Sequence, residues 1–113
     1  MRISGAHRHL NIVTRSELDR FAQKLKKHQI IGVDLEADSM YHFHEKVCLI
    51  QIATPRTTAV IDPLQINNLS VLKPVFKRND ILKVFHGADY DIRSLYRDFK
   101  ISVGNLFDTE MSC

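Results

Sequence analysis

The sequence lacks the features that mark membrane and secreted proteins. No apolar run approaches the length of a membrane span, and the first residues contain no uninterrupted apolar region before a small-residue cleavage site. Repeats and low-complexity tracts are also absent. We therefore expect a protein of the cytoplasm with no membrane partner.

Cysteine is scarce as well. The chain has two, Cys48 inside an apolar run and Cys113 at the last position. Their spacing fits neither a zinc knuckle nor a disulfide framework, which agrees with a cytoplasmic location. We expect Cys48 to be a buried thiol.

The composition is that of one soluble domain. The 113 residues suffice for one small core, and 44% of them are hydrophobic and 26% charged. The net charge of +3 slightly favours polyanionic binding partners. Clusters of Lys and Arg are typical of solvated helix faces, and on charge alone we favour that interpretation.

The first half of the chain predicts a helix followed by three strands. Thr14 and Glu17 form a capping box at the start of a helix over residues 14–28. Apolar, branched residues then predict strands at 30–36, 47–54 and 57–62. The first two strands are joined by a polar, His-rich segment typical of a hairpin connection. We expect these three strands to form an antiparallel meander.

The second half alternates helices and strands. A short helix is expected near 69–76, with Pro74 as a residue that would kink or end it. A strand at 81–86, a helix through Phe99 and a short strand near 103–107 follow. The inward face of that second helix should consist of Ala88, Ile92, Leu95 and Phe99. This order predicts an α/β fold, a mixed sheet with helices packed on it.

Two acids stand together near the end of the first predicted strand. Side chains alternate across a strand, so Asp34 and Glu36 share one side and their Cα atoms lie about 7 Å apart. Neighbouring carboxylates disfavour each other's ionised form, and a divalent cation removes that repulsion. All-oxygen ligation suits Mg²⁺ or Mn²⁺. The alternative is that both acids simply face water at a strand end.

A second acidic element follows the fourth predicted strand. Asp91 falls in the first turn of the next helix, where main-chain N–H groups favour an anion, and Asp89 is placed to do the same. Helix capping is the competing explanation for both. His86, at the end of the strand, is typical of a hydrogen-bonded structural histidine.

These residues resemble a known family. Asp34-x-Glu36 and His86-x-x-x-x-Asp91-x-x-x-Leu95 resemble the first two motifs of the DEDD 3′–5′ exonucleases, in the ribonuclease D-like branch. The surrounding segments "GVDLEADSMYHFHEKVCLIQIAT", "VFHGADYDIRSLYRDF" and "NLFDTEMSC" are similar too, and the similarity extends from about Val13 to the last residue. The resemblance implies a ribonuclease H-like sheet of three antiparallel strands followed by helix-linked ones.

The resemblance also implies a catalytic site. Asp34, Glu36 and Asp91 match metal ligands, and two Mg²⁺ or Mn²⁺ ions about 3.5–4 Å apart would support in-line attack of water on a phosphodiester. Asp34 would bridge both ions, Glu36 would hold one and orient the water, and Asp91 would hold the other. The substrate would be the 3′ end of a single-stranded nucleic acid, with RNA favoured by the resemblance, and the products 5′-mononucleotides.

Three further residues receive roles in the same way. The main chain around Leu35 would lie against the terminal nucleotide, and His86 would sit near it. Asp108 matches a family position that we expect to brace the start of the next helix.

The chain departs from the family pattern at one motif. The fourth acid, expected in Tyr-x-x-x-Asp or His-x-x-x-Asp, is absent, and the nearest match, Tyr41-x-x-x-Glu45, precedes the second motif. The resemblance therefore implies a truncated domain spanning residues 1–113, with three of the four acids. We expect weaker metal binding, low or lost activity, and apolar surface that promotes self-association.

Three other functions fit parts of the sequence. The first is a catalytically inactive nucleic-acid-binding domain of the same fold. The second is a phosphoacceptor receiver domain, for which Asp62 before a proline is a poor acceptor. The third is a zinc site at His42 and His44, with His7 and His9 as further candidates, although no third ligand has suitable spacing.

Overall fold

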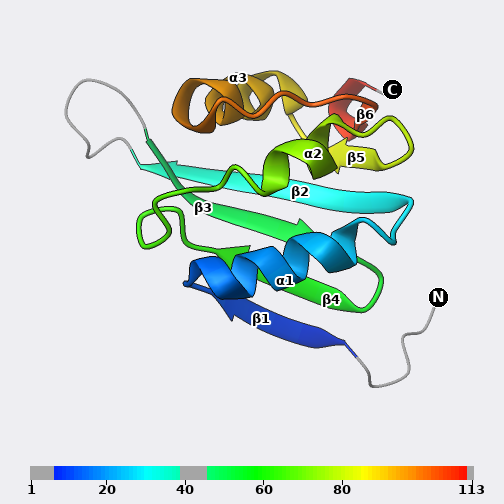
Figure 1. The fold of residues 1–113 in the computed structure, drawn as a ribbon. Coiled ribbons are helices and arrows are strands. Elements are labelled where there is room, and N and C mark those ends of the chain that lie inside the picture. Colours follow the sequence, from blue (N-terminus) through cyan, green and yellow to red (C-terminus); the bar gives the residue numbers. More distant parts are fainter. Residues whose placement is uncertain (1–6, 39–45, 112–113) are drawn as a thin grey trace.

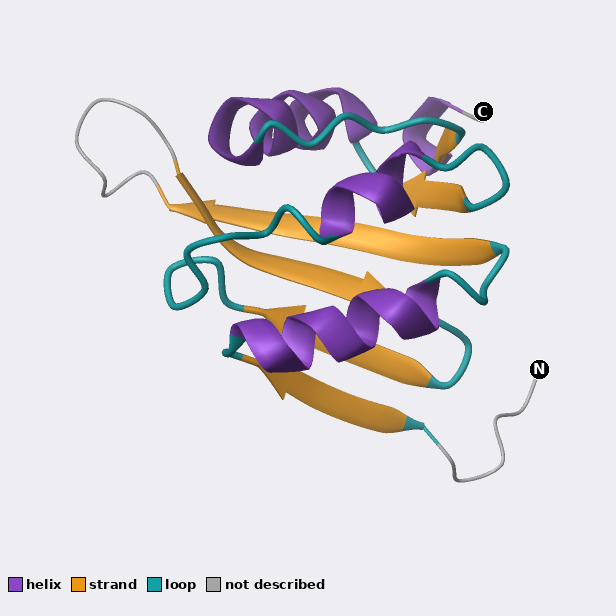
Figure 2. Ribbon diagram, in the orientation of Figure 1, coloured by secondary structure: helices purple, strands orange, loops and turns teal. Residues whose placement is uncertain are grey.

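The computed structural model describes residues 7–38 and 46–111. These residues fold as a mixed six-stranded sheet with three α-helices (Figure 1, Figure 2). The elements in chain order are β1 (Arg8–Ile12), α1 (Arg15–Leu25), β2 (Ile30–Asp38), β3 (Lys46–Ala53), β4 (Thr57–Ile61), α2 (Leu72–Lys77), β5 (Leu82–Phe85), α3 (Ala88–Phe99), β6 (Leu106–Asp108) and a 3₁₀ turn, η1 (Thr109–Met111).

The strand order is β1-β4-β3-β2-β5-β6. Strands β2, β3 and β4 pair antiparallel, which confirms the predicted meander. Strand β5 returns across the meander to pair in parallel with β2, and β6 pairs in parallel with β5. The sheet is therefore mixed, as the α/β prediction required.

Strand β1 was not predicted from the sequence. It precedes the first helix, pairs in parallel with β4 and forms one edge of the sheet. Only Ile12 of its five residues is buried, because an edge strand that stays largely in solvent needs few apolar side chains. The segment "RHLNI" therefore carries little of the alternating pattern by which strands are recognised.

The main core lies between one face of the sheet and helices α1 and α2. Both helices lie on the same side of the sheet (Figure 2). The buried strand residues alternate along β2, β3 and β4, and α1 contributes one apolar stripe. The set comprises Ile31, Val33, Ile50, Ile52, Ala59, Ile61, Leu18, Phe21, Ala22 and Leu25.

Helix α1 begins with the predicted capping box. The hydroxyl of Thr14 accepts the Glu17 N–H at 3.2 Å, and the Glu17 carboxylate accepts the N–H groups of Thr14 and Val13 at 3.1 and 3.0 Å. The helix ends at Leu25 rather than at residue 28. Beyond it the chain closes tighter i→i−3 turns, in which His28 donates to the Leu25 carbonyl.

Helix α2 is shorter than predicted and tolerates its proline. It runs from Leu72 to Lys77, with Pro74 in its first turn. Main-chain N–H groups in the first turn have no acceptor within the helix, so the missing N–H of Pro74 removes no helical hydrogen bond. Of the two predicted effects of Pro74, a kink or an end of the helix, the second does not occur, because the helix continues to Lys77.

The loop after α2 is held by a buried lysine. Lys83 on β5 is fully buried, and its ammonium donates to the carbonyls of Arg78 and Ile81 at 2.6 Å each. Burial lowers the pKa of Lys83, because the charged form loses water. The hydrogen bonds compensate for that loss and fix the entry of β5.

The segment after α3 packs against the end of α2. Gly104 donates its N–H to the Phe76 carbonyl at 2.9 Å, and a Cβ at this position would lie 2.9 Å from the Lys77 carbonyl oxygen. Only glycine permits this close approach. Strand β6 then begins at Leu106, later than the predicted 103–107.

The described helices, within residues 7–38 and 46–111, include none long and apolar enough to cross a membrane.

The capping box yields a stability prediction. Thr14→Ala removes the oxygen that accepts the Glu17 N–H and should lower the free energy of unfolding by about 1 kcal/mol. Chemical denaturation followed by circular dichroism measures the change. Thr14→Ser, which keeps the hydroxyl, is the matched control and should remain within a few tenths of a kcal/mol. Equal losses in both variants would show that the side-chain cap contributes nothing.

Candidate functional site

The two acids of β2 lie on the face opposite the main core. Ile31 and Val33 are buried beneath α1 and α2, whereas Asp34 and Glu36 are exposed. Leu35 is half-buried on the core side. This alternation confirms the predicted orientation of the strand, and it leaves both carboxylates available to a ligand.

Among the described strands, none pairs with β2 near these acids on the side away from β3. Strand β5 pairs with β2 only along Ile30–Gly32, and the chain then turns at Gly87, whose φ is 79°, into α3. Helix α3 continues along the sheet beyond the end of β5 (Figure 1). A main-chain hydrogen bond from Leu35 therefore reaches the Asp91 carboxylate instead of a strand.

Asp91 is buried next to other negative charges. Its side chain is 7% exposed, and its pKa is raised to about 6. Burial is the largest cause, followed by the negative charges of Asp34 and Asp108, while the Leu35 hydrogen bond acts in the opposite direction. The structure thus brings the acid of the second motif close enough to Asp34 for their charges to repel.

The described residues contain no group of three His, Cys, Asp or Glu side chains already placed to hold a metal ion. Asp34 and Asp91 are brought together, but Glu36 does not complete a ready-made cluster with them. Their donor chemistry still fits a hard divalent cation, because carboxylates that repel one another are stabilised when such an ion lies between them. The assignment of all three as metal ligands stays a prediction.

The structure distinguishes Asp89 from Asp91 at the start of α3, where the sequence offered the same role for both. Asp89 is exposed and pairs with Arg93 at 3.1 Å, on the outside of the helix. Neither it nor Asp91 caps the helix, since Gly87 is the N-cap residue and has no side chain. The buried Asp91 is therefore the acid that faces β2.

Asp108 performs the capping from a different element. Its carboxylate accepts the N–H groups of Gly87 and Ala88 at 2.9 and 2.7 Å, and the Glu110 N–H at 3.0 Å. These bonds, with that from Ala88 the largest cause, lower the pKa of Asp108. The sequence predicted that Asp108 braces the element that follows it. The structure shows that it also braces α3, which precedes it in the chain.

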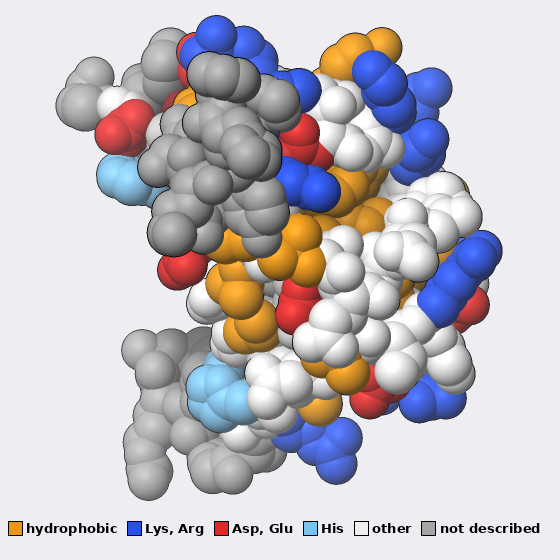
Figure 3. Space-filling model, turned by 90° about the vertical axis from the view of Figure 1, so that its left-hand side faces the viewer, with side chains coloured by type: hydrophobic (Ala, Val, Ile, Leu, Met, Phe, Trp, Pro, Cys, Tyr) orange, Lys and Arg blue, Asp and Glu red, His pale blue; other side chains and the backbone are white. Residues whose placement is uncertain are grey.

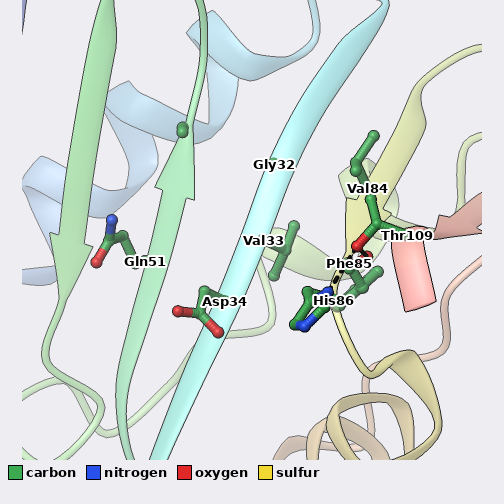
Figure 4. Close-up of a pocket in the computed structure, with 9 residues that line it drawn as sticks. Gly32, Val33, Asp34, Gln51, Val84, Phe85, His86 and Thr109 are labelled. Carbon is green, nitrogen blue, oxygen red and sulfur yellow. Dashed lines mark hydrogen bonds between the residues drawn. The ribbon is translucent and has the colours of Figure 1, made fainter.

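His86 is held beside the same face of the sheet. Its Nδ1 lies 2.8 Å from the Thr109 hydroxyl, which donates to the Phe85 carbonyl, and its Nε2 lies 3.7 Å from Glu110. The predicted hydrogen-bonded histidine is thereby confirmed. Figure 4 shows His86 between β2 and the end of β5, with Asp34 on β2.

A hollow of about 370 Å³ runs along this face. It lies over β2, β3 and β5 and is lined mainly by apolar and small side chains, with Asp34, Gln51, His86 and Thr109 as its polar members. On the face seen in Figure 3, hydrophobic side chains reach the surface between acidic ones, whereas Lys and Arg gather along the top and the right-hand side.

Two further predictions concern Cys48, expected to be a buried thiol, and the histidines of the alternative zinc site. Cys48 is half-buried rather than buried, and its thiol donates to the Glu36 carbonyl at 3.5 Å. His7 bonds Thr58 at 2.9 Å. His42 and His44, like the Tyr41-x-x-x-Glu45 segment, lie outside the described residues.

Comparison with known proteins gives a consistent set of similarities. A family model described as 3′-5′ exonuclease matches residues 10–113. The chain is 42% identical over 103 residues to Protein RRP6-like 3 of Arabidopsis thaliana, with 90% of this chain covered. It is 33% identical to Ribonuclease D of Bartonella henselae, with 99% covered.

Solved structures share the fold. The catalytic core of RRP6 from Trypanosoma brucei superposes with a TM-score of 0.88 at 34% identity, covering 96% of this chain and 30% of that one. The EXD2 exonuclease domain, in a structure soaked in Mg and GMP, superposes with a TM-score of 0.77 at 20% identity, covering 90% of this chain and 56% of that one, and so supports the fold alone. The chain spans only 12% of RRP6-like 3 and 28% of the Bartonella ribonuclease D.

The electrostatics of Asp91 can be tested by titration without metal. The side-chain carboxyl ¹³C resonance of Asp91 should titrate with a midpoint near 6. Asp34→Asn should lower that midpoint, because it removes a neighbouring negative charge. Asp89→Asn on the same helix is the control and should leave it unchanged. A midpoint that does not respond to Asp34→Asn would show that the two carboxylates do not interact.

The same pKa predicts how stability depends on pH. Folding raises the pKa of Asp91 from 3.8 to about 6, so the folded state binds this proton more tightly than the unfolded state. The stabilising contribution is complete below pH 3.8 and is lost as the pH rises through 6. Urea unfolding between these limits should show the wild type losing stability relative to Asp91→Asn, and parallel curves would contradict this.

Proposed function

Because the chain belongs to the 3′–5′ exonuclease family, alongside RRP6 and ribonuclease D, we propose that residues 1–113 form part of a single hydrolase domain that removes nucleotides from the 3′ end of RNA. Hydrolysis of the terminal phosphodiester would release 5′-mononucleotides one at a time. RNA is favoured over DNA because the relatives include a ribonuclease D.

One observation carries this proposal. Asp34 and Asp91 come from motifs at opposite ends of the sequence, yet the structure buries Asp91 where it feels the charge of Asp34. Structural carboxylates are normally placed beside cations or N–H groups, as Asp108 is. A buried acid whose pKa is raised by burial and by the charge of a second acid instead indicates a site built for an additional positive charge.

That charge would be a divalent cation, Mg²⁺ or Mn²⁺, in a two-ion arrangement. The donor set of Asp34, Glu36 and Asp91 consists only of carboxylate oxygens, which suits these ions and not zinc. When bound, such ions activate water and stabilise the departing 3′-oxygen.

The protein's own groups would position the substrate. Asp91 is held by burial and by the Leu35 main chain, and its carboxylate would bind one ion. Glu36 is exposed and would hold one ion and orient the attacking water. The main chain at Leu35 and the ring of His86, which is oriented by Thr109, would flank the terminal nucleotide.

A second candidate is an RNA-binding domain of the same fold without catalysis. One observation favours it: within the described residues, no three potential ligands are already placed for a metal ion. RNA would then bind without being shortened.

The cytoplasmic location and the self-association expected from the sequence stay predictions. Self-association has no support from the comparisons. The described residues do include large exposed hydrophobics at one edge of the sheet, Leu106 and Phe107, which are 41% and 45% exposed.

Single-stranded RNA labelled at its 5′ end separates the two candidates. With Mn²⁺ present, an active chain should produce a ladder shortened from the 3′ end. Asp34→Asn should slow this by more than about 100-fold, since even partners outside the metal's own ligands contribute roughly 10–100-fold. Asp89→Asn removes an exposed carboxylate from the same helix as Asp91 and should retain full activity.

Each outcome has a definite meaning. RNA binding without shortening at any Mn²⁺ concentration supports the inactive domain. Equal activity in Asp34→Asn and the wild type would refute the assigned role of Asp34.

A further inference from the structure

Helix α3 is tied to the sheet at both of its ends by aspartate carboxylates. At its start, Asp108 of β6 accepts main-chain N–H groups of the helix. Near its end, Asp98 accepts the main-chain N–H of Val47 on β3 at 2.8 Å. Asp91 lies between these two attachments, so they determine where the helix holds it.

The Val47 attachment is next to an irregularity in the sheet. Pairing between β2 and β3 passes from Glu36–Leu49 to Ala37–Val47, which leaves Cys48 as an extra residue on β3. A β-bulge bends its strand and increases the local twist. Figure 1 shows the start of β3 crossing over β2 towards α3, and α3 contacts β3.

Asp98 is suited to hold this position firmly. Its side chain is only 12% exposed and is also bonded by the Arg97 guanidinium at 2.7 and 3.1 Å. Although burial raises the pKa of Asp98, the hydrogen bonds from Arg97 and Val47 together lower it. The carboxylate therefore stays ionised at neutral pH and makes charge-assisted hydrogen bonds.

We propose that Asp98 is a positioning residue for the divalent-cation site. Its bond to Val47 fixes the β3 bulge, and with it the neighbouring Glu36, relative to Asp91, which lies on the same helix as Asp98. This inference rests on the proposed function of Asp34, Glu36 and Asp91 as ligands. Asp98 itself touches neither metal nor substrate.

The geometry explains how the effect would be transmitted. Glu36 pairs with Leu49, one residue from the bulge, and the Cys48 thiol donates to the Glu36 carbonyl. If the bulge loses its bond to α3, the side chain of Glu36 changes direction. Asp91 stays in place, because Asp108 and Leu35 still hold it. The Glu36 side chain is then displaced relative to Asp91, and the two carboxylates are less able to share one ion.

Mn²⁺ binding to the 113-residue chain tests the inference independently of catalysis. Isothermal titration should show that Asp98→Ala weakens Mn²⁺ binding about 10-fold, in the range measured for groups that orient metal ligands. Asp98→Asn keeps an oxygen that can accept the Val47 N–H and should bind Mn²⁺ nearly as the wild type does. Circular dichroism confirms that each variant is folded.

Asp80 supplies a matched control. It forms a bidentate pair with Arg78, as Asp98 does with Arg97, but it lies at the surface and bonds no other element in the described contacts. Asp80→Ala should leave Mn²⁺ binding unchanged. Amide hydrogen exchange provides a second readout, in which the Val47 N–H should exchange faster in Asp98→Ala and as slowly as in the wild type in Asp80→Ala.

The outcomes distinguish this inference from the function on which it rests. Wild-type protein that binds no Mn²⁺, or Asp34→Asn that binds it normally, overturns the metal site and the inference with it. If Asp34→Asn abolishes binding but Asp98→Ala and Asp80→Ala both bind normally, only the inference fails. If Asp98→Asn is as weak as Asp98→Ala, the lost charge is responsible, and positioning is again overturned.

Discussion

The site depends on one constraint, the early end of β5. This strand pairs with only three residues of β2, so the adjoining edge of β2 is left to helix α3. The Leu35 main chain consequently makes a hydrogen bond to the side chain of Asp91 on that helix and not to a strand. A longer β5 would satisfy the edge with ordinary strand pairing and exclude the helix. The two acidic motifs therefore come close together because β5 is short.

The fold keeps the acids together although they repel. Burial and the charges of Asp34 and Asp108 all disfavour the ionised form of Asp91. The helix that carries it cannot move away, because both of its ends are bonded to strands. The bonds at the two ends of α3 thus maintain an arrangement that is locally unfavourable, as is common where function and stability compete.

Local patterns in the sequence predicted most of the fold. The capping box at Thr14, the alternation along β2 and the meander each depend on residues close together in the chain. Strand β1, the bulge at Cys48 and the bond from Val47 to Asp98 depend on partners far apart in sequence, so no local pattern reveals them. The resemblance to a family identified Asp91 over Asp89, and the structure adds the reason, since only Asp91 faces inward.

The path of the chain through the sheet also bears on the order of folding. Strands β2, β3 and β4 are consecutive and can associate through short loops, whereas the chain after β4 must cross β3 and β2 before β5 pairs on the other side of β2. Closing that longer loop carries an entropic penalty before any contact offsets it. We therefore expect the meander to assemble first and α3 to dock on it later. The place where Asp91 meets Asp34 would then be among the last parts of the molecule to form during folding and among the first to open.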